Sequence, residues 1–207
     1  MSTQHGEPHT LEQQAIADAS PESRLLVIAG AGTGKTFTLI ARLVNLVEEY
    51  QVRPGGILVL SYTRAAVAEI KDRVRAAGGD VSFVRAVTFD SFASSILRQQ
   101  DPDGIWQTSD FDGRIRAAEQ LDLSEVLESY DHILVDEVQD LVRYRADLVK
   151  KILIDARAGF TLFGDLAQAI YNYQLPPAQR FLGSRKILRW VRSFFPDVEE
   201  HTLTTNH

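Results

Sequence analysis

The stretch "AGAGTGKT" at residues 29–36 stands between two different sequence patterns. The apolar run "RLLVI" (24–28) precedes it, and "FTLIARLVNLVEEY" (37–50), whose apolar residues recur with helical spacing, follows it. A glycine-rich loop between a strand and a helix can bind phosphate through backbone amides and the helix dipole. The alternative is an ordinary turn with an exposed lysine. The strand before the loop and the helix after it favour phosphate binding.

The loop residues have distinct expected roles. Glycines let a phosphate approach the backbone and permit backbone angles that other residues avoid. Lys35 would bring a positive charge to the terminal phosphates, and the Thr36 hydroxyl would bind Mg²⁺. The strict phosphate-loop pattern begins with glycine, whereas Ala29 takes that position here. The predicted phosphate-binding set is Ala29, Gly30, Ala31, Gly32, Thr33, Gly34, Lys35 and Thr36.

Aliphatic runs of strand length alternate with helical patterns along most of the chain. Continuous apolar strands are typical of a sheet covered on both faces, and the alternation predicts a mainly parallel α/β sandwich. Residues 101–130 break the rhythm, and we expect a small helical insertion there. The predicted strands are 24–29, 56–62, 81–87, 132–137 and 159–165, and the predicted helices are 34–50, 63–77, 88–99, 141–157 and 183–194.

Composition limits the class of protein. The 207 residues are 44% hydrophobic and 24% charged, as in an ordinary globular domain. The chain has no cysteine, which excludes disulfides and cysteine-based metal sites. No apolar run approaches the roughly 18 residues that span a bilayer, and the polar N-terminus is not a secretory signal. We therefore expect a cytoplasmic protein.

The charge is unevenly distributed. A net charge of −6 argues against a surface built wholly for nucleic acid. Residues 53–100, however, carry seven basic and four acidic side chains, a local charge of +3, so the remainder carries −9. Such a segment can contact a phosphate backbone, although a solvated helix face would show the same pattern.

A second motif, "HILVDEVQD" at 132–140, places Asp136 and Glu137 at the end of an apolar strand. Ligands of open α/β sheets bind at the carboxyl ends of the strands. There Asp136 would hold Mg²⁺ and Glu137 would polarise an attacking water. By themselves, two acidic residues after a strand more often belong to a solvated turn. Together with the phosphate loop, they favour a catalytic interpretation.

Six motifs in order resemble those of the UvrD/Rep-like superfamily-one DNA helicases. The resemblance implies a RecA-like P-loop NTPase domain, a three-layer sandwich that uses ATP and Mg²⁺ and binds single-stranded DNA. The motifs are "TLEQQAIAD" (10–18), "AGAGTGKT" (29–36), "LVLSYTRAAVAEIKDRV" (58–74), "VTFDSFA" (87–93), "ILVDEVQD" (133–140) and "FGDLAQAIYNY" (163–173).

On the nucleotide side, the resemblance implies three further contacts. Gln13, or less favourably Gln14, would read the adenine edge, unless it is only a surface glutamine of an N-terminal helix. Gln168 would sense the γ-phosphate and, with Lys35 and Glu137, complete the catalytic set. Phe37 takes a position where relatives often carry arginine, so it would stack on adenine or pack into the core.

On the DNA side, the resemblance assigns Tyr62, Thr63 and Arg64 to contacts with strand phosphates. Tyr173 would stack on a base, with a core aromatic as the alternative. Asp90 replaces the usual histidine, and an acid facing phosphate is repulsive. The second stretch of expected DNA contacts is Thr88 and Phe89.

Other departures from the family pattern concern packing, the coupling of hydrolysis to translocation, and contact with duplex DNA. Val138 replaces the usual aromatic of "DEFQD", a change in packing. Gln174 replaces an arginine, which would weaken coupling between hydrolysis and translocation. The 101–130 insertion is short for this family, so we expect a smaller grip on duplex DNA.

The family motor needs two RecA-like domains, and the second contributes arginines to the ATP site. The chain ends "HTLTTNH", one residue short of the arginine in the family's motif IV. We therefore expect 1–207 to be the first motor domain of a longer protein, with His207 at the adenine-stacking position. The alternatives are a nucleotide-gated scaffold without motor activity and a P-loop phosphotransferase.

Overall fold

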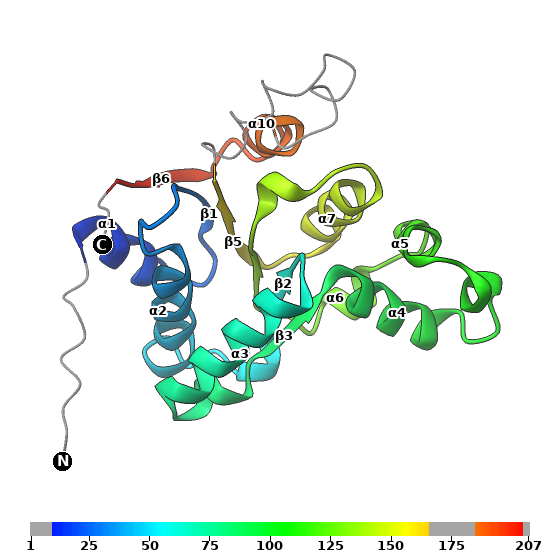
Figure 1. The fold of residues 1–207 in the computed structure, drawn as a ribbon, viewed down its shortest axis with the longest axis horizontal. Helices are drawn as coiled ribbons and strands as arrows, with labels where there is room; N and C mark the ends of the chain where they lie inside the picture. The colour runs from blue at the N-terminus through cyan, green and yellow to red at the C-terminus, as the bar shows by residue number, and fades with distance from the viewer. Residues whose placement is uncertain (1–9, 166–184, 205–207) are drawn as a thin grey trace.

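The computed structural model describes residues 10–165 and 185–204, and these form one six-stranded sheet in the order β3-β2-β4-β5-β1-β6 (Figure 1). Every neighbouring pair of strands is parallel. The predicted α/β class with a mainly parallel sheet is confirmed. The strands are β1 (Arg24–Ala29), β2 (Ile57–Ser61), β3 (Arg85–Thr88), β4 (His132–Val135), β5 (Gly159–Gly164) and β6 (Glu199–Leu203).

Helices cover both faces of the sheet, which gives three layers (Figure 1). Successive side chains of a strand point to opposite faces. In β1, Leu25 and Val27 therefore pack against one helical layer, and Leu26 and Ile28 against the other. The first layer holds α1 (Leu11–Ala17), α2 (Lys35–Glu48) and α3 (Arg64–Ala77), and the second holds α4 (Phe89–Gln100), α5 (Phe111–Glu119), α6 (Ser124–Leu127), α7 (Tyr144–Asp155) and α10 (Arg185–Phe194).

None of the helices in the described part of the chain is long and apolar enough to cross a membrane. Four short 3₁₀ turns join the other elements within the same residues. They are η1 (Pro54–Gly56), η2 (Asp80–Phe83), η3 (Ile105–Thr108) and η4 (Val138–Asp140).

The predicted strand at 81–87 is wrong in its first half. Residues 80–83 form η2, and β3 begins only at Arg85. Val81 and Val84 are buried while Phe83 is 75% exposed. Apolar residues three apart match the period of a 3₁₀ turn rather than the alternation of a strand.

Strand β6 was not predicted. It pairs with β1 at the edge of the sheet, and its sequence "EEHTL" is polar and mostly exposed. Charged residues are common on edge strands, where they discourage pairing with other chains. Such a strand lacks the apolar run that reveals a central strand.

The insertion at 101–130 is helical, as expected, and contains η3, α5 and α6. Ile115, Leu123 and Leu127 are fully buried. They belong to the same apolar core as Leu58 and Ile133 of the sheet. The insertion is therefore packed onto the α/β domain.

Candidate nucleotide site and nucleic-acid groove

The loop between β1 and α2 has the backbone of a phosphate cradle. Gly32 and Gly34 have φ angles of 80° and 77°, in the left-handed region that favours glycine. Gly34 caps α2 without a side chain, so no side-chain cap bonds the first amides of this helix. Uncapped amides and the positive end of the helix dipole together attract an anion.

Lys35, the first residue of α2, lies against the two carboxylates that follow β4. Its Nζ atom is 3.6 Å from Oδ1 of Asp136 and also contacts Oε1 of Glu137. Strand β5 lies between β1 and β4, so this ion pair spans the carboxyl ends of three adjacent strands. The two motifs, far apart in the sequence, therefore form one site.

The carboxylates of Asp136 and Glu137 are already paired with the Lys35 ammonium group. Burial raises the pKa of Asp136, which is 8% exposed, while the Lys35 ammonium lowers it and the Glu137 carboxylate raises it further. No group of three or more metal-binding side chains occurs among the residues that the structure describes. A divalent ion here would therefore depend on phosphate oxygens, which is the usual way that Mg²⁺ binds beside one or two carboxylates.

Gln139 fixes the Glu137 side chain. Its Nε2 atom donates to Oε2 of Glu137, and its Oε1 atom accepts from the backbone N–H of Asp165 at 2.9 Å. Glu137 itself has a φ of 55°, an uncommon conformation that clusters at functional sites. No role was expected for Gln139 from the sequence. Its place two residues after Glu137 in "DEVQD" is the signal that could have identified it.

The end of β5 leaves room for this arrangement. A Cβ atom at Gly164 would lie 2.9 Å from Cγ1 of Val138 and 3.5 Å from Oε1 of Gln139. Glycine therefore allows η4 to pack closely against β5. Val138 is fully buried, in agreement with the expectation that its departure from the family aromatic affects packing.

The remaining residues expected around the nucleotide differ in exposure. Gln13 is 2% exposed and forms a capping box with Thr10, since its Oε1 atom accepts from the Thr10 N–H and its own N–H donates to the Thr10 hydroxyl. Phe37 is 36% exposed. Contacts of either side chain with adenine stay predictions. Gln168 and His207 lie outside the described residues.

A hollow of about 560 Å³ lies at the same side of the sheet as the phosphate loop, where the carboxyl ends of β2 and β3 are. Tyr62, Arg64 and Thr88 line it, so three of the residues expected to contact DNA share one surface. Thr63 and Thr88 also cap α3 and α4, because their hydroxyls accept from backbone N–H groups at 3.0 and 3.2 Å.

One other expected DNA contact, Phe89, does not line this hollow. Phe89 is 1% exposed and packs in the core, so any contact with DNA would be left to its backbone. Its side chain is a buried anchor of α4 and is not available to a base. Tyr173 and Gln174 lie outside the described residues.

Asp90 lines the hollow but is paired. Oδ1 of Asp90 lies 3.3 Å from a guanidinium nitrogen of Arg145, which also bonds Asp112 at 2.9 Å. The Arg145 guanidinium lies 5.5 Å from the centre of the Tyr62 ring. The repulsion expected between Asp90 and phosphate is thus opposed by a fixed cation.

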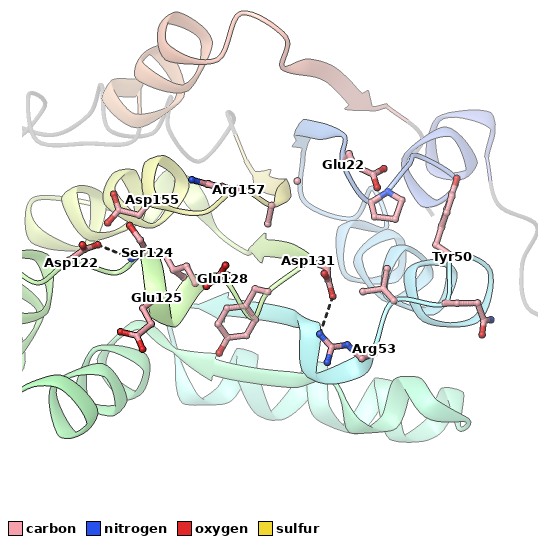
Figure 2. Close-up of a pocket in the computed structure, with 17 residues that line it drawn as sticks. Glu22, Tyr50, Arg53, Asp122, Ser124, Glu125, Glu128, Asp131, Asp155 and Arg157 are labelled. Carbon is pink, nitrogen blue, oxygen red and sulfur yellow. Dashed lines mark hydrogen bonds and ion pairs between the residues drawn. The ribbon is translucent and has the colours of Figure 1, made fainter.

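A larger hollow, about 850 Å³, lies at the opposite, amino end of the strands, beside Asp131, which precedes β4, and Gly159, the first residue of β5 (Figure 2). Its acidic lining would repel phosphate, which argues against a nucleotide or DNA site there. Two arginines, Arg53 and Arg157, and six acids line it: Glu22, Asp122, Glu125, Glu128, Asp131 and Asp155.

The sequence matches the family described as UvrD/REP helicase N-terminal domain over residues 10–128 and 105–186. The chain belongs to this family. UvrD2 from Mycobacterium tuberculosis, named an ATP-dependent DNA helicase, is 34% identical over 142 residues, which cover 63% of the chain and 19% of that protein. PcrA from Staphylococcus aureus, with the same description, is 38% identical over 98 residues, which cover 47% of the chain and 13% of PcrA.

A solved structure supports the fold of this UvrD/REP helicase N-terminal domain. Unliganded Pif1 from Bacteroides sp. aligns with 97% of the chain and 42% of its own length, with a TM-score of 0.51 and 17% sequence identity. The chain itself spans about a fifth of the length of UvrD2, since the match covers 19% of that protein.

Proposed function

We propose that this chain is the nucleotide-binding motor domain of an ATP-dependent DNA helicase or translocase, which uses ATP hydrolysis to move along single-stranded DNA. The observation that carries the proposal is the ion pair of Lys35 with Asp136 and Glu137 at the uncapped start of α2. A hollow lined by aromatic and basic side chains at the same sheet edge offers a place for the strand. The names of the relatives agree with this reaction.

Each side chain has a specific task in this proposal. Lys35 exchanges its carboxylate partners for the terminal phosphates, which the loop amides hold from the other side. Thr36 and Asp136 would hold Mg²⁺, which when bound neutralises charge on the phosphate oxygens. Glu137 orients an attacking water and accepts its proton, while Gln139 keeps the Glu137 carboxylate in place.

We also propose that a second RecA-like domain outside 1–207 completes the site. No arginine in the described part of the chain is hydrogen-bonded or ion-paired to Asp136 or Glu137. Phosphoryl transfer commonly uses an arginine supplied across such an interface. In this proposal residues 101–130 are a reduced accessory insertion within the first domain. A cytoplasmic location stays a prediction.

The test is calorimetric titration of the chain with Mg-ATP. We expect weak but measurable binding, because only one half of the site is present. Lys35→Ala should abolish the binding with little change in the unfolding temperature. Lys150→Ala, which removes an ion-paired lysine of α7, is the matched control and should bind as the parent does. Equal titrations for Lys35→Ala and the parent would refute the nucleotide site.

A further inference from the structure

The hollow at the ends of β2 and β3 has a wall made by the insertion. Phe111, the first residue of α5, is 56% exposed, and Arg114 follows one turn later. Both line the same hollow as Tyr62, which is 38% exposed. The Arg114 guanidinium lies 5.7 Å from the centre of the Phe111 ring. The insertion therefore presents an aromatic face and a cation to this surface.

Three of the four arginines in this lining have no carboxylate partner among the described residues. These three are Arg64, Arg98 and Arg114. The Nε–H group of Arg114 is shielded from solvent and has no acceptor in the same part of the chain. By contrast, Arg145 is paired with two carboxylates. Unpaired arginines beside exposed aromatic rings favour an anionic ligand with a flat ring system.

The hollow also continues along the insertion. A neighbouring hollow of about 540 Å³ shares Ser94, Arg98 and Arg114 with the first and extends to Pro102 and Trp106. The two hollows therefore form one path over the surface of α4 and the insertion. A path of this kind suits an extended polymer better than a single compact molecule.

We propose that α5 forms a second wall of the single-strand groove, in which Phe111 stacks on one base and Arg98 and Arg114 bind the phosphates beside it. This inference rests on the proposed function, because it requires that the strand passes the ends of β2 and β3. The exposed face of a base is free for stacking only in a single strand, so this wall selects single-stranded DNA over duplex. The short insertion then contributes directly to the affinity for the translocated strand.

The experiment is fluorescence anisotropy of a labelled oligothymidylate with the chain, at about 50 and 200 mM salt. Phe111→Ala should weaken binding about 5- to 150-fold, the range for loss of one base stack. Arg114→Gln should weaken binding and reduce the slope of log affinity against log salt by roughly 0.7. On an oligonucleotide made of abasic sites, Phe111→Ala should bind as the parent does, whereas Arg114→Gln should stay weaker.

Two controls isolate the wall. Phe83→Ala removes an aromatic ring that is 75% exposed on η2, and Arg157→Gln removes an exposed cation of the acidic hollow at the amino end of the strands. Both variants should leave the affinity nearly unchanged. Parent-like binding of oligothymidylate by Phe111→Ala, or an equal loss on abasic strands, would overturn the assignment of α5 and leave the proposed function standing. A parent chain that binds no single strand at low salt would overturn both.

Discussion

The side-chain oxygen of Gln139 accepts a hydrogen bond of 2.9 Å from the backbone N–H of Asp165. The amide group of the same side chain donates to the Glu137 carboxylate. Gln139 is 4% exposed and Asp165 is 2% exposed. One buried amide therefore connects the expected catalytic carboxylate with the end of β5, where the "GDLAQ" stretch begins.

Gln139→Ala should lower the free energy of unfolding by about 1–3 kcal/mol, because it removes both hydrogen bonds in a buried place. Gln139→Glu keeps an acceptor for the Asp165 N–H but sets a second carboxylate against Glu137. The loss in free energy of unfolding should therefore be larger for this variant at pH 7 than near pH 4, where protonation relieves the repulsion. Urea denaturation of both variants at the two pH values measures this difference. A pH-independent deficit for Gln139→Glu would contradict the contact.

The isolated chain should hydrolyse ATP negligibly, with hardly any stimulation by single-stranded DNA. If the proposed second domain supplies an arginine, its absence removes roughly 4–7 kcal/mol of transition-state stabilisation, from a rate factor of about 10³–10⁵. A phosphate-release assay checks this, with Glu137→Gln as the control for contaminating enzymes. Robust DNA-stimulated turnover that vanishes in Glu137→Gln would mean that the site is complete within the chain.

Asp90→Asn should raise the affinity for single-stranded DNA about 2- to 5-fold at low salt. The substitution removes one negative charge from the groove and releases part of the Arg145 charge for phosphate, an effect typical of partly exposed charges. The gain should shrink at high salt. Asp131→Asn, in the acidic hollow at the amino end of the strands, makes the same change in charge and should have little effect. Anisotropy titrations compare the two, and an equal gain in both would point to net charge alone.

The buried side chain of His132 should make the folding stability of the domain depend on pH. Its side chain is fully buried between the Pro21 carbonyl oxygen at 2.7 Å and the Thr161 hydroxyl at 2.9 Å. Burial and, to a smaller extent, the charge of Arg42 lower the pKa of His132 to about 3, against the raising effect of the Pro21 hydrogen bond. The unfolded chain binds a proton near pH 6.5 and the folded chain does not. Stability is therefore fully present above pH 6.5 and falls as the pH drops towards 3.

The expected contribution of His132 to this loss is up to about 1.4 kcal/mol per pH unit. His132→Asn, which removes the titrating ring, should show a shallower decline than the parent between pH 6.5 and 4. Denaturation of both proteins across this range gives the two slopes. Parallel slopes would mean that His132 accepts a proton in the folded state as readily as in the unfolded state.

Local patterns predicted the central part of the fold and the phosphate loop. Strands such as β1 and β4 are buried on both faces, so their apolar runs are unbroken, and the glycine spacing of 29–36 needs no tertiary information. The polar edge strand β6 lacks such a run, and the apolar spacing of η2 resembles a strand over a short window. These elements are defined by their packing.

The parts of the site that depend on distant residues could not be predicted in the same way. Arg145 neutralises Asp90 although 55 residues separate the two, and no local pattern reveals this pair. Gln139 likewise acquires its role only when β4 and β5 lie side by side. Sequence motifs indicate which residue types meet at the sheet edge, and the fold determines which of them make contact.

The burial of the insertion has a mechanical consequence. Ile115, Ala118 and Leu127 of the insertion are fully buried in one core with the sheet, and α5 packs on α4 and α7. Helix α5 therefore cannot separate from these helices without exposing that core to water. The two sides of the hollow therefore move as one stiff body. If the hollow holds a single strand as proposed, a change between tight and loose binding should therefore come from reorientation of the whole domain or from rotation of side chains, rather than from separation of the insertion from the sheet.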